Sequence, residues 1–350
     1  MKRILVLGAQ VPFVRGGAEL LNESLVTEIN KLEGYQAELV QLPYKWYPEE
    51  QLFDDIMAWR MLDLTESNGK KVDLVIATKF PTYAAKHPNK VLWLVHQHRY
   101  FYDLEFSRYD AMHNAEDSKQ IRDKIRAIDT KLIGECKPVY TIAQNVSNRL
   151  KKYNGIDSTA LFPPAPLSAT IKSGSYGDYI VYLGRVELIK RVDLLVEALR
   201  ESKKDVKVII IGKGDDMVRI QKLIETYGLQ KRCKMLGYVE DEVLIDTLAN
   251  AKALFYAPLD EDYGYATIEA FLAKKLVVTC EDSGEVANIV KDTGSGFVCD
   301  VDPKKIAKVF DEIYSYTDLE LSLKAASGYK FASEISWKNV LDKLVIQNTQ

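Results

Sequence analysis

The clearest candidates for chemistry are two glutamates, Glu261 and Glu269, which seven residues separate in the segment LDEDYGYATIEAFLAKKLVV (259–278). A Tyr-Gly-Tyr sequence lies between them, and the pattern predicts a helix that begins near Ala266. Glu261 then precedes the helix and Glu269 lies on its first turns, with free backbone N–H groups between them. One carboxylate can orient sugar hydroxyls, the other ribose hydroxyls, and the N–H groups a diphosphate. Equally, such glutamates can simply stabilise the helix dipole.

Two cations, Arg185 and Lys190, follow an apolar run that ends at Gly184 in YLGRVELIKRVDLLVEAL (182–199). A helical pattern comes directly after them, so they are expected at the end of a strand. An arginine fork and a lysine point charge at such a position are what a departing diphosphate needs. Neither cation has an obvious carboxylate neighbour in the sequence. A solvated loop of lysine and arginine remains the other interpretation.

Glycines follow two further apolar runs. Gly16 and Gly17 precede Ala18-Glu19 after the first run, and Gly212 opens a Gly-x-Gly turn in IIIGKGDD (209–216). Such glycines allow the backbone to approach a ligand, and a helix N-terminus favours negative charge. A dinucleotide-binding G-x-G-x-x-G would follow the strand directly, which GAQVPFVRGGAE does not provide. Flexible loops remain an alternative at both places.

The composition excludes several classes of protein. Four cysteines, at 136, 233, 280 and 299, form no Cys-x-x-Cys pair and have no histidine at ligand spacing, so we expect reduced core thiols in a cytoplasmic protein. With only four histidines, we expect neither a metal site nor a cofactor. A net charge of −3 argues against a nucleic-acid partner. No apolar run approaches the roughly 18 residues that would span a bilayer, and Ile4–Ala9 indicates a buried strand rather than a signal peptide.

Short apolar runs alternate with amphipathic helical patterns along the whole chain, which predicts an α/β protein with two doubly wound Rossmann-like sheets. The predicted strands are residues 4–9, 72–78, 91–96 and 139–143 in the first sheet, and 179–184, 206–212, 233–237, 253–258, 276–280 and 296–300 in the second. Predicted helices include 192–199 and 217–227.

The domains follow from these elements. The segment 162–178 contains prolines and glycines and has no periodicity, which is typical of a linker. We expect an N-terminal Rossmann-like domain at 1–165, a linker at 166–178, a C-terminal Rossmann-like domain at 179–330, and a helix at 331–350 that packs back on the N-terminal domain. Two such domains facing across a cleft would bind ligands there. A sugar-nucleotide epimerase, a phosphorylase-like enzyme or a dehydrogenase would also fit.

An ordered set of motifs resembles family 4 of the retaining glycosyltransferases, which have the GT-B fold. In the C-terminal half these motifs are GRVELIK, the Gly-x-Gly turn, LGYVEDEVL (236–244) and the two spaced glutamates. The N-terminal half adds GGAE (16–19), WLVHQHRYFYDL (93–104) and AQNVSNRLKKYNGIDSTALFPP (143–164). The resemblance covers nearly the whole chain, with the N-terminal domain expected to bind the acceptor.

The resemblance implies roles for individual residues. Arg185 and Lys190 resemble the pair that binds the donor phosphates, Glu269 the carboxylate on the ribose, and Glu261 the carboxylate facing the donor sugar. His96 resembles the histidine near the reacting carbon, with His98 as the alternative. The expected catalytic residues are His96, Arg185, Lys190 and Glu261. The expected donor-binding residues are Gly16, Gly17, Gly184, Arg185, Lys190, Gly212, Tyr238 and Val239 (whose backbone would hold the base), Glu261, Tyr263, Gly264, Tyr265, Ala266, Thr267 and Glu269.

The sequence departs from the family pattern at two places. Lys274 and Lys275 stand where a small, glycine-bearing stretch is usual, and Glu285 takes the place of a second glycine after TCEDSG (279–284). The side chains at these places hinder a close approach of the backbone to a ligand. A choice of donor that differs from the usual one would follow from this.

The function implied by the resemblance is transfer of a sugar from a nucleoside-diphosphate sugar to a glycan or lipid-linked acceptor, with retention and without metal. The alternatives are a nucleotide-sugar epimerase and a catalytically inactive nucleotide-sugar-binding protein; two hydrolytic carboxylates are disfavoured because both glutamates have donor roles. Lys119, Arg122 and Arg126 lie at helical spacing and suggest a face for the inner leaflet of a membrane, or merely a solvated helix. We expect a cytoplasmic protein, peripheral to the membrane if that face binds lipid.

Overall fold

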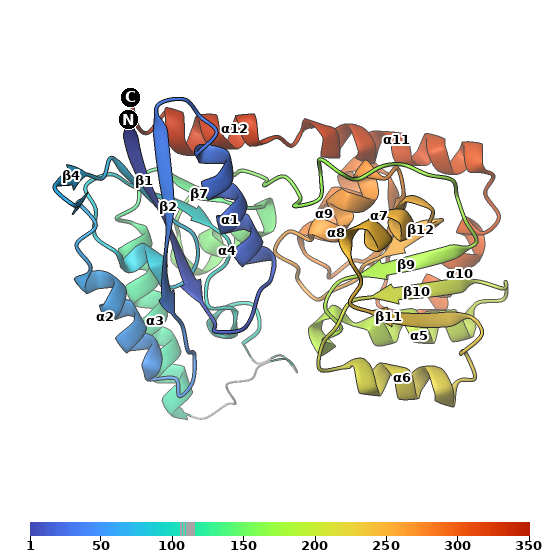
Figure 1. The fold of residues 1–350 in the computed structure, drawn as a ribbon. Helices are drawn as coiled ribbons and strands as arrows, with labels where there is room; N and C mark the ends of the chain where they lie inside the picture. The colour runs from blue at the N-terminus through green and yellow to red at the C-terminus, as the bar shows by residue number, and fades with distance from the viewer. Residues whose placement is uncertain (106, 108, 110–115) are drawn as a thin grey trace. The chain divides into compact units, whose positions relative to one another are not determined.

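The computed structural model describes residues 1–105, 107, 109 and 116–350, and it divides the chain into two compact units. The first unit comprises Met1–Pro166 together with Ser336–Gln350, and the second comprises Leu167–Ile335. Each unit is built around a six-stranded sheet in which all neighbouring strands run parallel (Figure 1). Parallel strands of this kind are buried on both faces, which explains their apolar composition.

The first unit has the strand order β2-β1-β5-β6-β7-β8. Its strands are β1 (Lys2–Gln10), β2 (Tyr35–Pro43), β5 (Leu74–Ala77), β6 (Lys90–Leu94), β7 (Val139–Thr141) and β8 (Thr159–Ala160), with a small hairpin of β3 (Glu66–Ser67) and β4 (Lys70–Lys71). Its helices are α1 (Gly17–Ile29), α2 (Gln51–Met61), α3 (Glu116–Ile133), α4 (Gln144–Asn154) and α12 (Trp337–Leu341). The strand order reverses between β1 and β5, so ligands are expected beyond the carboxyl ends of these two strands.

The second unit has the strand order β11-β10-β9-β12-β13-β14. Its strands are β9 (Tyr179–Leu183), β10 (Lys207–Ile211), β11 (Cys233–Gly237), β12 (Ala253–Phe255), β13 (Leu276–Cys280) and β14 (Gly296–Cys299). Its helices are α5 (Val192–Glu201), α6 (Met217–Thr226), α7 (Asp241–Ala249), α8 (Tyr265–Leu272), α9 (Glu285–Thr293), α10 (Pro303–Ile313) and α11 (Asp318–Glu334). Helices lie on both sides of the sheet (Figure 1). Here the order reverses between β9 and β12.

All ten strands predicted from apolar runs are present, and the two predicted helices correspond to α5 and α6. The sequence analysis did not find β2, β8 or the β3–β4 hairpin. The reason for β2 is its place at the sheet edge, where only Ala37 is buried and the other residues are partly or largely exposed, so that no apolar run forms. The prediction that α8 begins near Ala266 is correct to one residue.

The stretch after Pro166 is attached to the second unit. Gly174 N donates to Ala249 O at 3.0 Å, and Gly177 N donates to Asn250 O at 2.8 Å. A Cβ at Gly177 would lie 2.5 Å from that same carbonyl oxygen, so only glycine allows this approach. The composition therefore predicted that this stretch lacks regular secondary structure, but it did not predict the hydrogen bonds that fix the stretch to the end of α7.

Lys275, one of the two departures from the family pattern, holds this same stretch. Its side chain is fully buried, and its ammonium donates to Ser175 O at 2.9 Å and lies 4.0 Å from the centre of the Tyr176 ring. Because Lys275 precedes β13, it lies at the amino end of the strand, opposite to the edge where ligands bind.

The C-terminal segment packs against the first unit. The Trp337 ring lies edge-on to Trp93, with centroids 6.4 Å apart, and the Asn89 amide donates to Asn348 O at 2.8 Å. These contacts explain why Ser336–Gln350 belongs to the first unit even though the preceding helix α11 belongs to the second.

The basic residues of α3 do not form a single exposed face, as the membrane-surface interpretation would need. Arg122 is 1% exposed and lies 3.7 Å from the Glu105 carboxylate, while Arg126 donates to Glu105 and to the Phe101 carbonyl. Lys119 alone of the three is exposed. The spacing was correct, but two of the three cations serve the unit's own structure.

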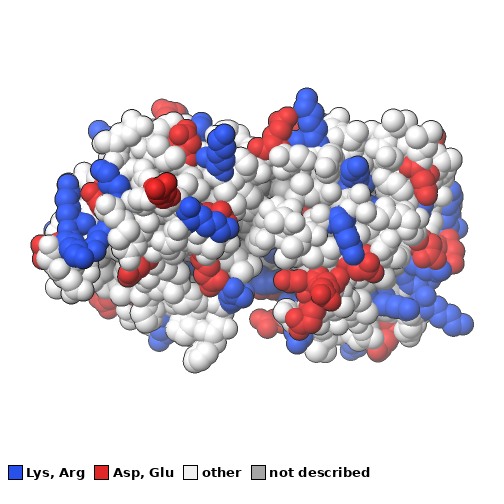
Figure 2. All heavy atoms as spheres, turned by 45° about the horizontal axis from the view of Figure 1, so that its top comes forward, with Lys and Arg blue, Asp and Glu red and all other residues white. Residues whose placement is uncertain are grey.

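The cysteines agree with the expectation of buried, reduced thiols. Lysine and arginine are scattered among acidic side chains on the face of each unit seen in Figure 2. All four cysteines are buried and free. Within the described residues, no helix is long and apolar enough to cross a membrane, and no group of three histidine, cysteine or acidic side chains could hold a metal ion.

Candidate functional site

The loops after β9 and β10 are packed against each other at the switch point of the second sheet. Gly184 and Gly212 both have positive φ, +146° and +135°, and a Cβ at Gly212 would lie 1.8 Å from Gly184 O. Gly214 is similarly enclosed, since its Cβ would lie 2.1 Å from Val186 O. The Gly-x-Gly turn is thus required for one loop to lie on the other.

Lys190 and Glu261 form an ion pair across this switch point. The Lys190 ammonium donates to Glu261 Oε2 at 2.6 Å and lies 3.4 Å from the Tyr256 hydroxyl. The two charged side chains are only 12% and 16% exposed, so the pair is largely removed from water. Lys190 comes from the loop after β9 and Glu261 from the loop after β12, so the strand order brings them together.

Arg185 is more exposed than Lys190, with 59% of its side chain accessible, and it donates to Glu187 at 2.7 Å. The expectation that neither cation has a carboxylate neighbour in the sequence was therefore wrong for Arg185, while the partner of Lys190 comes from a distant segment. Glu187 lies two residues from Arg185, whereas Glu261 lies far from Lys190 in sequence and could not be paired with it by inspection. Both cations lie at the carboxyl edge, as the motif predicted.

Glu269 is buried on α8, 8% exposed. Burial, together with the negative charge of Asp241, raises the pKa of Glu269 to about 7. None of the described lysines or arginines forms an ion pair with it to oppose this shift. A carboxyl group in this state can accept hydrogen bonds from ligand hydroxyls, which would favour its charged form.

The N-terminus of α8 begins at a tight turn. Gly264 has φ +84°, and a Cβ there would lie 2.6 Å from the Val286 side chain. Thr267 N donates to Gly264 O at 2.9 Å, while Tyr265 and Ala266 occupy the first turn, whose N–H groups have no helical partner. The helix start thus offers backbone donors and a positive dipole end beside Glu261.

Arg191 is a structural residue of this site that the sequence analysis missed. It has φ +51° and is 3% exposed. Its guanidinium makes two hydrogen bonds to Asp282, of 2.6 and 2.7 Å, and donates to the carbonyls of Ala257 and Pro258. It therefore ties the loop after β9 to those after β12 and β13. An arginine directly after Lys190 was the only signal, and nothing in the sequence separated it from a solvated cation.

Glu285, the other departure from the family pattern, is 2% exposed at the start of α9. Its backbone N–H donates to the carbonyl of Glu261 at 3.0 Å. That N–H is therefore engaged in holding the loop that carries Glu261.

At the end of β11, Tyr238 is 64% exposed, and the Lys213 ammonium lies 5.7 Å from the centre of its ring. An exposed aromatic ring at the carboxyl edge of a sheet offers a face on which a base can stack. The neighbouring Val239 is half-buried.

In the first unit, Gly16 caps α1 with an extended backbone, and its N–H donates to Glu19 Oε2 at 2.9 Å. The other oxygen of Glu19 accepts from Lys79 at 2.7 Å, with both side chains about nine-tenths buried. Burial alone would raise the pKa of Glu19, but Lys79 and the Gly16 N–H lower it below its usual range. Glu19 lies on α1, which follows the loop after β1, and Lys79 lies in the loop after β5. Their ion pair therefore fixes the glycine turn at the switch point of the first sheet.

The two candidate histidines differ in environment. His98 is 8% exposed among aromatic rings, and its Nδ1 lies 3.0 Å from the Tyr44 hydroxyl. Burial lowers its pKa to about 3, so it is neutral at physiological pH. His96 is half-buried, with its Nδ1 2.8 Å from the Gln97 carbonyl oxygen. His96 is therefore the more accessible of the two.

Comparison with known proteins identifies the second unit. Residues 171–327 match the family model described as glycosyl transferases group 1. The second unit belongs to this family. The resemblance stated from the sequence is confirmed at this level.

Curated relatives match over part of the chain. A phosphatidylinositol N-acetylglucosaminyltransferase GPI3 subunit of Saccharomyces cerevisiae (strain YJM789) is 32% identical over 135 residues, which are 37% of this chain and 30% of the yeast protein. An N-acetylgalactosaminyltransferase of Campylobacter jejuni that acts on a diphospho-undecaprenol-linked sugar is 25% identical over 165 residues, 46% of this chain and 44% of that protein. The chain therefore covers less than half the length of these relatives.

Solved structures match over nearly the whole chain and show the fold. Sucrose-phosphate synthase from Thermosynechococcus elongatus superposes with a TM-score of 0.79 at 12% identity, covering 99% of this chain and 98% of that one. HepE of Anabaena, in complex with UDP and glucose, superposes with a TM-score of 0.69 at 15% identity, covering 99% of each chain. The GT-B fold expected for a group 1 glycosyltransferase is confirmed.

The candidate residues therefore fall into two sets. The set on the second unit lies at the carboxyl edge of its sheet and comprises Gly184, Arg185, Lys190, Gly212, Tyr238, Val239, Glu261, Tyr263, Gly264, Tyr265, Ala266, Thr267 and Glu269. The set on the first unit lies at the corresponding edge of the other sheet and comprises Gly16, Gly17 and His96. Within each unit the candidates share one edge although they come from several loops.

Proposed function

We propose that the protein transfers a sugar from a nucleoside-diphosphate sugar to a hydroxyl group of a glycan or lipid-linked acceptor, with retention of configuration and without a metal ion. The observation that carries this proposal is the carboxyl edge of the second sheet. There a largely buried cation, a carboxylate bound to it and the start of α8 share one edge of the sheet with a second, buried carboxyl group. A cation and helix N–H groups suit a diphosphate, and carboxylates suit sugar and ribose hydroxyls.

The printed names of the relatives support the same class of donor and acceptor. The yeast and Campylobacter relatives are named as N-acetylglucosaminyl- and N-acetylgalactosaminyltransferases, and both names include a lipid. The Anabaena structure contains UDP. Uridine-diphosphate N-acetylhexosamines are therefore the first donors to test, with a lipid-linked sugar or inositol as the first acceptor.

The proposed reaction forms a bond between the acceptor oxygen and the anomeric carbon and breaks the bond from that carbon to the donor diphosphate. The acceptor attacks on the side from which the diphosphate departs, and its proton passes to an oxygen of the leaving phosphate. Arg185, Lys190 and the first N–H groups of α8 would stabilise the charge that develops on that phosphate. Glu269 would hold the ribose and Glu261 the transferred sugar.

The test is a thermal-shift panel of uridine, guanosine and adenosine diphosphate sugars, followed by transfer assays with the donor that stabilises most. A ligand at 100 times its dissociation constant stabilises a protein by about 2.7 kcal/mol, which such an assay detects. Transfer to an added acceptor with the α- or β-linkage of the donor retained is the expected result. Donor consumption without acceptor, giving free nucleotide and a glycal, would indicate an epimerase instead. Binding without turnover for every acceptor would indicate an inactive binding protein.

The sequence predicts a location in the cytoplasm, at the inner surface of the membrane if α3 binds lipid, and this stays a prediction. With Arg122 and Arg126 turned inward, α3 gives membrane binding little support. We propose that any contact of this protein with a membrane is made through a lipid-linked acceptor rather than through α3.

A further inference from the structure

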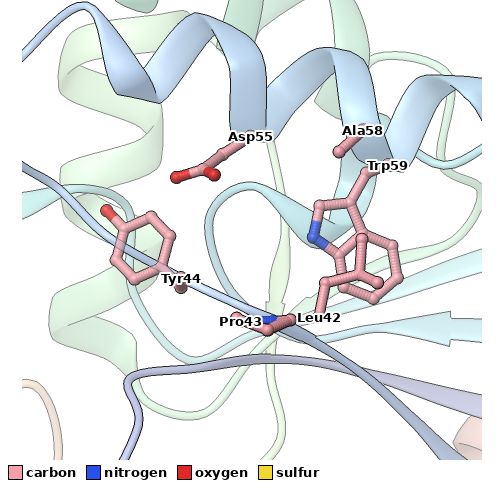
Figure 3. Close-up of a pocket in the computed structure, with 6 residues that line it drawn as sticks. All are labelled: Leu42, Pro43, Tyr44, Asp55, Ala58 and Trp59. Carbon is pink, nitrogen blue, oxygen red and sulfur yellow. The ribbon is translucent and has the colours of Figure 1, made fainter.

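We propose that a cavity in the first unit, between the end of β2 and α2, is a subsite for a neutral, polyhydroxylated ring of the acceptor. The proposal rests on the proposed function, because it names the chemistry of the acceptor that the enzyme would use. Six residues line the cavity, namely Leu42, Pro43, Tyr44, Asp55, Ala58 and Trp59 (Figure 3). The three from β2 and its end face the three from α2.

The size of the cavity suits a single ring. Its volume is about 160 Å³, whereas pockets for drug-sized ligands are about 300–1,000 Å³. It can therefore enclose one sugar or cyclitol ring but not an extended oligosaccharide. Leu42 and Pro43 give it an apolar floor, and Tyr44 and Trp59 give it aromatic walls (Figure 3). Apolar and aromatic walls of this kind pack against the C–H faces of a ring.

One polar group in the cavity lacks a partner. Asp55 Oδ2 is buried and accepts no hydrogen bond from the described residues. Burial raises the pKa of Asp55, and hydrogen bonds to its carboxyl group from the Gln51 side chain and the Lys45 backbone only partly oppose this shift. Because a buried acceptor without a donor is destabilising, a ligand hydroxyl that donates to Oδ2 would satisfy the one carboxylate oxygen that the described residues leave without a donor.

The neighbouring donor indicates a hydroxyl rather than an ammonium group. The indole nitrogen of Trp59 lies on the edge of the ring turned toward Asp55 and Tyr44 (Figure 3). An indole N–H only donates and a carboxylate only accepts, whereas a hydroxyl does both. A ligand hydroxyl can thus engage both groups, while an ammonium could engage only Asp55.

The cavity lies at the functional edge of the first sheet. Tyr44 directly follows β2, and its hydroxyl lies 3.0 Å from Nδ1 of His98, which follows β6 together with His96. The carboxyl ends of parallel strands meet at one edge, so the cavity wall is connected through one hydrogen bond to the loop that carries the candidate histidine. An acceptor ring held here would lie next to that loop.

The experiment measures direct binding of small probes to the full chain by saturation-transfer NMR. The probes are methyl α-D-glucopyranoside, myo-inositol and the protonated methyl glycoside of glucosamine. The variant is Asp55→Asn, which keeps the size but turns one oxygen into a donor. Asp54→Asn is the matched control, since it makes the same change at an exposed neighbour on α2. Melting curves of both variants verify folding.

We expect at least one neutral probe to bind. Asp55→Asn should weaken this binding by about tenfold or more, as for loss of a charged hydrogen bond. Asp54→Asn should leave the binding unchanged. No binding by any neutral probe, or equal binding by Asp55→Asn, would overturn the proposal. Stronger binding of the amino sugar that depends on Asp55 would also overturn it, in favour of a cation subsite.

UDP titrations on the same samples separate this proposal from the proposed function. If Asp55→Asn binds UDP normally and binds the probes as well as the parent does, the subsite alone is overturned. If the parent binds the probes but no nucleotide, the proposed donor function is overturned. Asp55→Ala serves as a second variant if Asp55→Asn is unstable, and the same loss of probe binding is expected.

Discussion

At the scale of single residues, Glu269 shows a conflict between folding and its proposed role in binding. Its carboxyl group is buried without a cation partner within the described part of the chain, and its pKa is raised to about 7. A glutamine of the same shape would avoid the cost of burying a charge. Groups that are unfavourable for folding but present at a ligand-binding edge are typical of functional sites.

Glu269→Gln should therefore stabilise the ligand-free protein at alkaline pH. The pKa of Glu269 rises from 4.5 to about 7 on folding, so the folded state holds a proton that the unfolded chain has lost between these values. The contribution of Glu269 to the free energy of unfolding is therefore most favourable below pH 4.5. It is lost as the pH rises from 4.5 through 7, by up to about 3 kcal/mol in all. The variant lacks this fall. Urea unfolding at pH 5.5 and pH 8 measures it, and a variant less stable than the parent at pH 8 would contradict the assignment.

Glu261 and Glu269 should respond differently to nucleotide. Glu269→Gln removes the proposed acceptor for ribose hydroxyls, so UDP and intact donor should both bind more weakly by about tenfold or more. Glu261→Gln instead releases Lys190 from its 2.6 Å ion pair. Free diphosphate should then bind equally well or more tightly, while turnover falls because the transferred sugar loses its partner.

Calorimetry with UDP and then with intact donor tests both variants. Loss of UDP binding in Glu261→Gln with retention in Glu269→Gln would reverse the two roles. Equal losses for both ligands in both variants would indicate that the loop has lost its structure.

At the scale of elements, close contact between loops determines the geometry of the carboxyl edge of the second sheet, where the donor is proposed to bind. The loops after β9 and β10 touch through Gly184 and Gly212, and Arg191 ties three loops together. The positions of Lys190 and Glu261 depend on these contacts.

Gly212→Ala should destabilise the second unit strongly. The new Cβ would lie 1.8 Å from Gly184 O, and the residue has φ +135°, so we expect a loss of more than about 3 kcal/mol or no folded protein. Gly228→Ala is the control, because Gly228 has φ +67° but no atom within 4 Å of the added Cβ. It should cost only about 1–2 kcal/mol. Thermal melts compare the two, and similar small losses would show that the loops can separate.

The elements also show what the sequence could and could not predict. Strands buried on both faces, such as β9 and β10, are continuous apolar runs and were found. The half-exposed edge strand β2 has no such run and was missed. Motif residues such as Lys190 were placed at the correct edge because strand ends are visible in the sequence. The pairing of Lys190 with Glu261, the inward turn of Arg122 and the role of Arg191 depend on contacts between distant segments, which no local pattern encodes.

At the scale of the whole molecule, the candidate residues are divided between two units that each have a sheet of their own. The donor-type residues Lys190, Glu261 and Glu269 all belong to the second unit, while Gly16 and His96 belong to the first. Donor binding and transfer are therefore expected to be separable.

Chelation should leave transfer essentially unchanged. The proposed stabilisation of the leaving diphosphate relies on Arg185, Lys190 and the start of α8 rather than on a metal ion. Rates measured in EDTA and in added Mg²⁺ or Mn²⁺ should agree within about twofold. Loss of activity in EDTA that metal restores would show that the diphosphate is neutralised by a metal instead.

A fragment of residues 167–335 should fold and bind nucleotide by itself. It contains the complete second sheet, its helices and the stretch at 174–177 that is hydrogen-bonded along α7. It also contains every expected donor-binding residue except Gly16 and Gly17. We expect its UDP affinity to lie within about tenfold of the full chain, a difference of about 1.4 kcal/mol, with no transfer because the acceptor residues are missing. Glu269→Gln in the fragment is the control, and it should weaken UDP as it does in the full chain. A folded fragment, shown by circular dichroism and a cooperative melt, that fails to bind UDP would mean that the first unit supplies a necessary part of nucleotide binding, with Gly16 and Gly17 the first residues to test.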